Sequence, residues 1–254
     1  APAVRTRLPP GQRTVAPQVT ISEVDGVRYL HFGSIWVQGA MRIARPFALE
    51  IDYQQQMMAP ALFVPRPGHV VQLGLGAAAL TKFCWRHLPQ ADISVVEISE
   101  AVIAAARRWF KLPPEDERLT LIPAAGAGGC FLPPLLAGRR RPSAAPPRGV
   151  SRPPAGAGWA AGPPDWLQVD LYDADAAGPV YDDEVFYAAC RRLLAPHGVA
   201  AINLFGRSFE PSRRAIDAAF DGQWRALPEA DAGNLIVLAF GRMVQDIPYS
   251  SLYT

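Results

Sequence analysis

The amino-acid sequence predicts an α/β protein with a doubly wound, mostly parallel sheet. Apolar runs of strand length alternate with segments of helix length from residue 69 onward. Gly74 and Gly76 follow the first of these runs, and Glu97 ends the second. Strands that alternate with helices in this way pair in parallel and need helices on both faces.

The composition is that of a globular enzyme. The 254 residues fit one large domain, or one domain with a small appendage. Half of the residues are hydrophobic and 19% are charged, and the formal net charge is +2. Because so small a net charge creates no strong field toward nucleic acid or membranes, we expect neither as a partner.

No targeting segment stands out in the sequence. Residues 1–20 contain arginines but lack the apolar core of a secretory signal. No apolar run approaches the roughly 20 residues of a membrane span. We therefore expect a cytoplasmic protein.

The potential metal ligands are scattered. Cys84, Cys130 and Cys190 form no CxxC pair, and the four histidines show no HxxxH spacing. An odd and sparse set of cysteines is not typical of a disulfide framework or of a zinc site. We expect no metal.

The order of patterns divides the chain into three parts. Residues 1–20 are rich in Pro, Arg and Gln and are expected to form a mobile arm. Residues 21–63 are expected to form a small β-hairpin with its turn at Asp25-Gly26, followed by a helix over 53–63. The apolar face of that helix is predicted to consist of Met57, Met58, Leu62 and Phe63. Residues 64–254 are expected to form the α/β domain.

Within this domain the apolar runs predict the order of strands and helices. Strands are expected at 69–73, 93–97, 119–122, 166–170 and 199–205, with a last strand at 234–240 after a hairpin partner at 223–227. Helices are expected at 77–88, 99–110, 183–194 and 211–220. Ser99 is a predicted N-cap, and Asp182-Asp183-Glu184 fits a helix start, where acids favour the helix dipole.

Residues 124–164 interrupt the pattern with a low-complexity stretch of Ala, Gly, Pro and Arg. The favoured interpretation is a disordered surface insertion. Two alternatives remain open. The arginines at 139–141 could form a basic arm for an anionic partner, or a local frameshift in GC-rich DNA could produce this composition.

The glycine turn after the first strand is typical of a ligand-binding loop. Gly74-Leu75-Gly76 lets the backbone approach a ligand, and the following helix N-terminus presents unpaired N–H groups. Glu97 lies at the carboxyl end of the next strand, where nucleotide-binding α/β folds place an acid for ribose hydroxyls. The joint placement favours a nucleoside site over an ordinary loop acid.

A pair of carboxylates follows the fourth strand. Asp170 ends the strand at the carboxyl edge of the sheet, where doubly wound folds bind ligands, and Asp173 comes three residues later. One carboxylate there can accept a proton from an amine and the other can hold a cationic substrate. The alternative, a helix-capping or loop acid, applies best to Asp173 taken alone.

Several segments together resemble the spermidine synthase (polyamine aminopropyltransferase) family, in particular a divergent bacterial spermidine synthase-like branch. The resemblance covers roughly residues 20 to 205 apart from the insertion. The segments that carry it are Gln38 through Phe63 with Tyr53-Gln54, Val71 through Gly76, Leu80 through Phe83, Val95 through Ile98, Val102 through Arg107, Val169 through Asp173, Gly178-Pro179 and Phe186 through Gly198.

This resemblance implies a sheet of the S-adenosylmethionine methyltransferase (Rossmann-like) type with a small N-terminal β element and a gate helix. It implies transfer of an aminopropyl group from decarboxylated S-adenosylmethionine, as co-substrate, to a polyamine, without a metal. Asp170 would be the base, and Asp173 would hold the polyamine beside Tyr53. The nucleoside pocket would consist of Gln38, Gln54, Gly74, Gly76 and Glu97. A polyamine and a nucleoside would be the small-molecule partners, and relatives of this kind commonly form homodimers.

The sequence also departs from the family at several acids. Ala77 stands where an Asp would bind the aminopropyl ammonium, and Ala125-Gly126 stands where an acid would read adenine. Gln55 and Ala59 replace an acid and a His of the gate region. Two further functions therefore stay open: an S-adenosylmethionine-dependent methyltransferase on the same sheet, and a non-catalytic relative that binds no nucleoside.

Overall fold

The computed structural model describes residues 18–34, 36–123, 161–172, 181–206, 208–230 and 233–241. The predicted arm up to residue 17 and the predicted insertion from 124 to 160 lie outside these residues. Asp173 and the pair Ala125-Gly126 also lie outside them.

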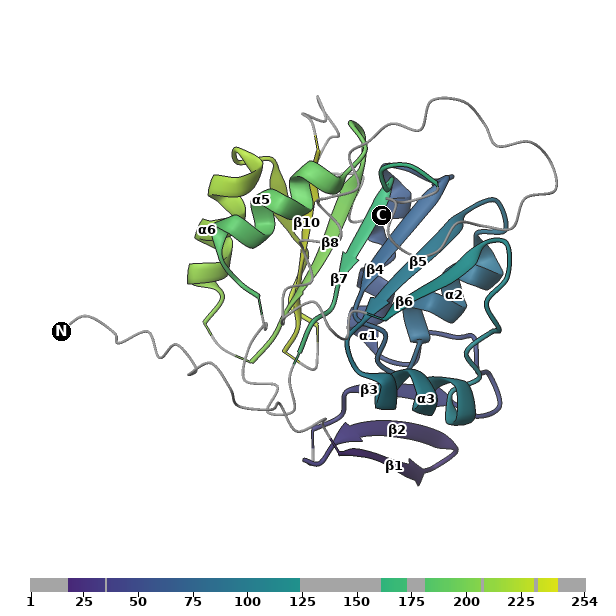
Figure 1. The fold of residues 1–254 in the computed structure, drawn as a ribbon. Helices are drawn as coiled ribbons and strands as arrows, with labels where there is room; N and C mark the ends of the chain where they lie inside the picture. Colours follow the sequence, from purple (N-terminus) through teal and green to yellow (C-terminus); the bar gives the residue numbers. More distant parts are fainter. Residues whose placement is uncertain are drawn as a thin grey trace, which may run out of the picture.

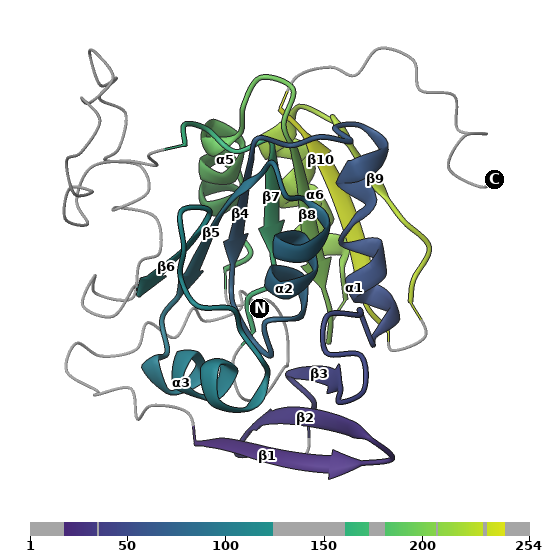
Figure 2. The ribbon, with the colours of Figure 1, turned by 90° about the vertical axis from the view of Figure 1, so that its right-hand side faces the viewer.

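The N-terminal part is a small antiparallel sheet in the order β1-β2-β3, with β1 at Val19–Val24, β2 at Val27–Phe32 and β3 at Gly39–Arg42. The predicted hairpin is present, and both turn residues have the positive φ of a type I′ turn: 50° at Asp25 and 75° at Gly26. Figures 1 and 2 show this sheet beside α3, next to the carboxyl ends of the parallel strands.

The main sheet has seven strands in the order β6-β5-β4-β7-β8-β10-β9. The strands are β4 at His69–Leu73, β5 at Asp92–Glu97, β6 at Leu119–Pro123, β7 at Trp166–Val169, β8 at Val199–Leu204, β9 at Trp224–Ala226 and β10 at Leu235–Phe240. Strands β4 to β8 pair in parallel, and β10 runs antiparallel to both β8 and β9. The predicted fold class is confirmed.

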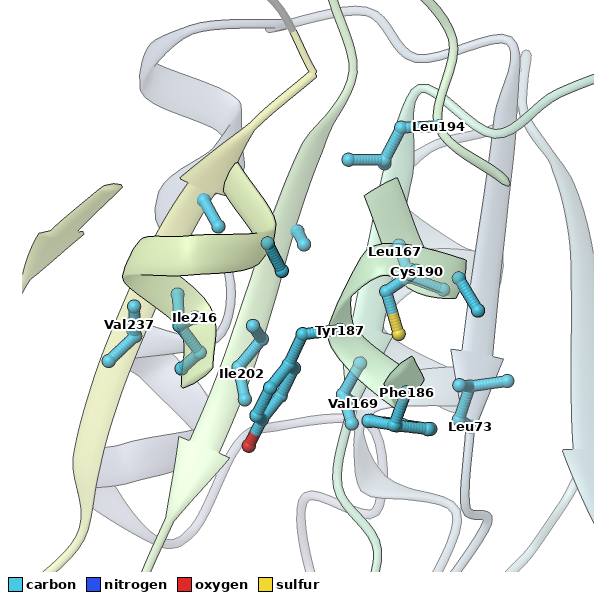
Figure 3. Close-up of a cluster of buried hydrophobic side chains, with 14 of the residues drawn as sticks. Leu73, Leu167, Val169, Phe186, Tyr187, Cys190, Leu194, Ile202, Ile216 and Val237 are labelled. Atoms are coloured by element: carbon cyan, nitrogen blue, oxygen red, sulfur yellow. The ribbon is translucent and has the colours of Figure 1, made fainter. Parts of the chain in front are cut away.

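Helices cover both faces of this sheet (Figures 1 and 2). The helices are α1 at Asp52–Gln56, α2 at Ala79–His87, α3 at Glu100–Trp109, α5 at Glu184–Leu193 and α6 at Glu210–Phe220, with a 3-10 helix, η1, at Ala59–Leu62. On one face α5 and α6 bury Phe186, Tyr187 and Ile216 against β4, β7, β8 and β10, as Figure 3 shows. On the other face, α2 and α3 form one buried cluster and the α1–η1 segment forms another.

The helix ends follow local chemistry. Ser99 caps α3, as predicted, and Asp183 caps α5 at the helix start expected there; each accepts a hydrogen bond from a backbone N–H three residues later. Helix α2 begins at Ala79, two residues later than expected, because Ala78 has a left-handed φ of 55°. None of the helices in the described ranges is long and apolar enough to cross a bilayer.

The predicted helix over 53–63 is wrong in its length. It is divided into α1 and η1, with Pro60 at the second position of η1, where its missing N–H is tolerated at a helix start but not in a helix interior. The predicted apolar face is also partly wrong. Met57 is fully buried, but Leu62 is 60% exposed, because the break changes the side that each later residue presents.

The sheet reverses its direction of growth between β4 and β7. Strand β5, next in sequence after β4, lies on one side of β4, and β7 lies on the other. The backbone pairing continues just past the strand ends, since the N–H of Gly74 donates to the Val96 carbonyl and that of Asp170 to the Leu73 carbonyl. Ligands of open α/β sheets bind at such a switch point.

Candidate active site

A pocket lies at this switch point. Its empty space, open to solvent, amounts to about 300 Å³. The residues that line it are Gln38, Gly39, Tyr53, Gln54, Gly74, Leu75, Gly76, Ala77, Ala79, Leu80, Thr81 and Asp170. The structure therefore brings together all the site residues predicted from sequence except Glu97, which is outside this lining, and Asp173, which is outside the described residues.

The glycine loop forms one wall of the pocket. Gly74 has a φ of 96°, and a Cβ on it would collide with the carbonyl oxygen of Asp170. Gly76 has a φ of 50°, and a Cβ on it would lie 3.2 Å from the Gln38 carbonyl oxygen. Gly74 therefore lets the loop pack against the end of β7, and Gly76 lets it pack against the backbone at Gln38. The start of α2 follows directly, and its first N–H groups have no partner within the helix, so they can serve the acceptor atoms of a ligand.

Glu97 lies behind this loop and holds it. Its Oε2 accepts a 3.0 Å hydrogen bond from the backbone N–H of Leu75, and its Oε1 accepts a 2.8 Å bond from the N–H of Ser99. Burial raises the pKa of this carboxyl, and the backbone N–H donors oppose the rise. A carboxylate has about four acceptor positions, so these two bonds do not use its full capacity to accept hydrogen bonds.

Among the described residues that line the pocket, Asp170 is the one with a carboxylate, and its two oxygens have different partners. Oδ2 accepts a 3.2 Å hydrogen bond from the Tyr53 hydroxyl, and Oδ1 accepts a 2.8 Å bond from Nδ2 of Asn203. Burial raises the pKa of Asp170, while the donors on Asn203 and Tyr53 act in the opposite direction. A carboxylate with a raised pKa in a pocket is suited to accept a proton.

Tyr53 belongs to α1, lines the same pocket and reaches this carboxylate with its hydroxyl. Burial, followed by the neighbouring charge of Asp170, raises the pKa of the Tyr53 hydroxyl well above its usual value. The hydroxyl therefore keeps its proton and acts as a hydrogen-bond donor. Gln54, the next residue, is buried, and its Oε1 accepts a 3.4 Å bond from the Ile51 N–H.

Aromatic rings lie beyond the ends of β7 and β8. Tyr172 and Phe205 make an edge contact with their centroids 6.2 Å apart, and Phe205 makes a similar contact of 6.3 Å with Trp36. The Tyr172 hydroxyl donates to the Asn203 carbonyl at 2.8 Å. Trp36 is half exposed, so this aromatic group reaches from the neighbourhood of Asp170 to the surface.

Asn203 and Asn234 are the site residues that sequence reasoning missed. Asn203 lies in β8, and Nδ2 of Asn234 donates a 2.9 Å bond to its Oδ1. One signal was available, since Asn203 is a polar residue near the carboxyl end of an otherwise apolar strand. Its meaning depends on β8 being the neighbour of β7, which the register shows by pairing Val169 with Ile202.

The described residues contain no group of three or more His, Cys, Asp or Glu side chains that could hold a metal ion. Cys84 and Cys190 are free and buried, and burial raises the pKa of each thiol to about 12. These thiols are therefore protonated at neutral pH and are poor nucleophiles.

Known proteins with similar sequences carry one name. The chain is 29% identical over 238 residues to a polyamine aminopropyltransferase of Chromobacterium violaceum, covering 93% of this chain and 80% of that protein. It is also 29% identical over 227 residues to the polyamine aminopropyltransferase of Neisseria meningitidis serogroup A, covering 88% and 76%. No protein-family model matches the chain.

Solved structures share the fold at lower identity. A probable spermidine synthase from Corynebacterium glutamicum superposes with a TM-score of 0.64 at 17% identity, covering 87% of this chain and 76% of that one. Human methyltransferase-like protein 13, in complex with SAH, gives 0.58 at 20% identity, covering 79% and 87%. The spermidine synthase from Thermotoga maritima gives 0.52 at 16% identity, covering 92% and 77%. The chain therefore resembles the polyamine aminopropyltransferases in sequence over most of its length and has the methyltransferase-like fold of spermidine synthases.

Proposed function

We propose that this chain is a spermidine synthase-like aminopropyltransferase that moves an aminopropyl group from decarboxylated S-adenosylmethionine to a polyamine acceptor. The observation that carries the proposal is the position of Asp170. Its carboxylate lines the same pocket as the glycine loop, at the switch point of the sheet, in a chain similar to curated polyamine aminopropyltransferases.

The reaction requires an amine with a free lone pair, since an ammonium cannot attack carbon. The acceptor nitrogen forms a bond to the carbon next to the sulfonium, and the carbon–sulfur bond breaks with its electron pair going to sulfur. Before the attack, the Asp170 carboxylate takes a proton from the acceptor ammonium and frees the lone pair. Sulfur leaves as the neutral thioether of methylthioadenosine, and the product nitrogen is a secondary ammonium. The other groups of the pocket position the reactants and exclude water.

The nucleoside of the donor would lie along the glycine loop. Gln38 and Gln54 are lining residues with amide side chains, and Gly74 and Gly76 leave room for close backbone approach. Glu97 supports this loop through Leu75 and would accept hydrogen bonds from ribose with its remaining capacity. These residue types suit a neutral, hydroxyl-rich ligand.

The acceptor would approach Asp170 from the side of Tyr53. We propose that Tyr53 and Asp173 bind the polyamine, with Asp173 supplying a second negative charge. We also propose that the enzyme works on these small molecules as a homodimer and uses no metal.

A second candidate function is S-adenosylmethionine-dependent methyl transfer. The observation that favours it is Ala77, which lines the pocket beside Gly76 and offers no carboxylate to the ammonium of a decarboxylated donor. The two functions differ in their product nucleosides, which are methylthioadenosine and S-adenosylhomocysteine.

The test combines binding with turnover. Calorimetric titration should show tighter binding of methylthioadenosine than of S-adenosylhomocysteine. Incubation with decarboxylated S-adenosylmethionine and putrescine should release methylthioadenosine and form spermidine, as measured by mass spectrometry.

Asp170→Asn should abolish turnover but keep nucleoside binding. A matched control is Glu117→Gln, which removes an exposed carboxylate outside the pocket. Tighter binding of S-adenosylhomocysteine would instead support methyl transfer. If neither nucleoside binds, both proposals are overturned.

A further inference from the structure

A chain of hydrogen-bonded amides leads from the base into the protein interior. Asn234 Nδ2 donates to Asn203 Oδ1 at 2.9 Å, and Asn203 Nδ2 donates to Asp170 Oδ1 at 2.8 Å. Asn203 is 4% exposed and Asn234 is 6% exposed, so both amides are shielded from solvent. We call Asp170, Asn203 and Asn234 the amide relay.

The relay determines the orientation of the Asn203 amide. The amide oxygen of Asn203 accepts from Asn234, so its NH₂ group faces Asp170. Rotating the amide by 180° would set NH₂ against the NH₂ of Asn234 and oxygen against the Asp170 carboxylate. Both contacts would be repulsive in a buried site, where an unsatisfied polar group costs about 1–3 kcal/mol. Asn234 therefore supports the donor that Asp170 uses.

The relay also makes the two oxygens of Asp170 unequal. Oδ1 is occupied by a buried amide, whereas Oδ2 meets Tyr53, whose side chain lines the pocket. The titratable groups among the described residues that face Asp170 are Tyr53 from α1 and Tyr172 from the end of β7, and Asp182 acts in turn on Tyr172. Both tyrosines have pKa values raised by burial and the nearby carboxylate, so they stay neutral. The hydrogen bond from Asn203 therefore stabilises the negative charge of Asp170 at Oδ1, the oxygen on the interior side.

We propose that Asn203 and Asn234 are positioning residues, which bind Asp170 through Oδ1 and leave Oδ2 as the oxygen that takes the proton from the acceptor amine. This inference rests on the proposed aminopropyl transfer for its catalytic meaning. Neither asparagine is among the residues that line the pocket, so both would act through Asp170. Since the Asn203 hydrogen bond lowers the pKa of Asp170 against the effect of burial, the relay keeps the base ionised over a wider pH range.

The experiment compares variants that each change one hydrogen bond of the amide relay. Asn203→Leu removes the donor, and Asn203→Asp replaces it with a second carboxylate. Asn234→Ser leaves Asn203 in place but weakens the bond that orients it. The matched control is Gln168→Leu, which also removes a buried amide: Gln168 donates to the Met57 carbonyl at 2.8 Å and accepts from Gln72 at 2.7 Å, without a bond to Asp170.

The acid limb of the pH profile of kcat is the first readout. We expect it to move upward by about one unit in Asn203→Leu, because a lost hydrogen bond to the charged form raises a carboxyl pKa. Compared with Asn203→Leu, Asn203→Asp should move the acid limb further upward, and Asn234→Ser should move it upward by less. Because every variant uses the same acceptor amine, a difference between profiles belongs to the enzyme. Gln168→Leu should lower the melting temperature and leave the limb in place.

The second readout does not need activity. Carbon-13 NMR titration of the aspartate carboxyls, with the Asp170 signal assigned by its loss in Asp170→Asn, gives the midpoint of Asp170 directly. Upward shifts in Asn203→Leu and Asn234→Ser, but not in Gln168→Leu, would support the relay. Unchanged midpoints would overturn it, even if activity falls. If the wild type titrates as expected but transfers no aminopropyl group, the proposed function fails while the electrostatic role of the relay stands.

Discussion

Gly74 lies directly against the backbone of Asp170, so closely that a Cβ on Gly74 would collide with the Asp170 carbonyl oxygen and lie 3.1 Å from its carbonyl carbon. The glycine loop and the Asp170 backbone are therefore parts of one packed unit. Position 74 requires glycine for two reasons: the Asp170 backbone leaves no room for a Cβ, and the φ of 96° disfavours any residue with a side chain.

We expect Gly74→Ala to separate the loop from the end of β7. The positive φ alone costs about 1–2 kcal/mol, and the collision adds an overpacking cost of about 1–3 kcal/mol. The free energy of unfolding in urea should fall by this sum. Methylthioadenosine affinity should fall more than tenfold.

Gly26→Ala is the matched control for Gly74→Ala. Gly26 also has a positive φ, 75°, but nothing lies within 4 Å of a Cβ built on it. Its substitution should reproduce only the cost of the backbone conformation and should not change nucleoside affinity. Equal losses of stability in the two variants would show that the contact with Asp170 carries no weight.

Glu97 should matter for nucleoside binding through the loop that it holds. In Glu97→Gln an NH₂ group replaces one carboxylate oxygen and faces a backbone N–H, either that of Leu75 or that of Ser99. Hydrogen bonds to a charged group contribute about 1.5–3 kcal/mol, so methylthioadenosine should bind roughly ten- to a hundredfold more weakly by calorimetry.

The control is Glu115→Gln. Glu115 Oε1 also accepts a backbone N–H, from Leu121 at 2.9 Å, but this residue is exposed and does not line the pocket. That variant should keep the wild-type affinity. An unaltered affinity in Glu97→Gln would contradict the role assigned to Glu97.

The sequence predicted the sheet well because burial on two faces leaves a simple pattern. Strand β4 is buried at every position, and its residues are apolar except for His69 and Gln72. The regions predicted less well depend on single backbone conformations. The division of the helix over 53–63 and the late start of α2 follow from Pro60 and from the left-handed Ala78, neither of which changes the apolar pattern.

The site was predictable in part for a similar reason. Gly74 and Asp170 directly follow the ends of β4 and β7, so the strand pattern alone is enough to locate them. Asn203 could not be located in this way, because its partner is determined by which strands are neighbours in the sheet. Glu97 was placed at the correct strand end, but its bonds to Leu75 and Ser99 depend on the path of the loop backbone.

Lys82 should give the protein a pH-dependent stability that is separate from its chemistry. The side chain is 1% exposed, and its Nζ donates a 2.8 Å bond to the carbonyl of Phe110 at the end of α3. Burial lowers the pKa of Lys82 from 10.5 to about 7. Between these values the unfolded chain binds more protons than the folded chain, so the folded state gains stability as the pH rises from about 7 toward 10.

We therefore expect the free energy of unfolding of the wild type, relative to Lys82→Met, to rise over this range. The slope should be at most about 1.4 kcal/mol per pH unit. Urea denaturation at several pH values between 7 and 9 measures this slope.

Lys111→Met is the control, because Lys111 is the other lysine of the chain and is exposed. The difference in free energy of unfolding between the wild type and Lys111→Met should not follow this slope. If the difference between wild type and Lys82→Met is the same at every pH, Lys82 carries its proton throughout, and the Phe110 carbonyl together with the negative end of α3 must outweigh the cost of burial.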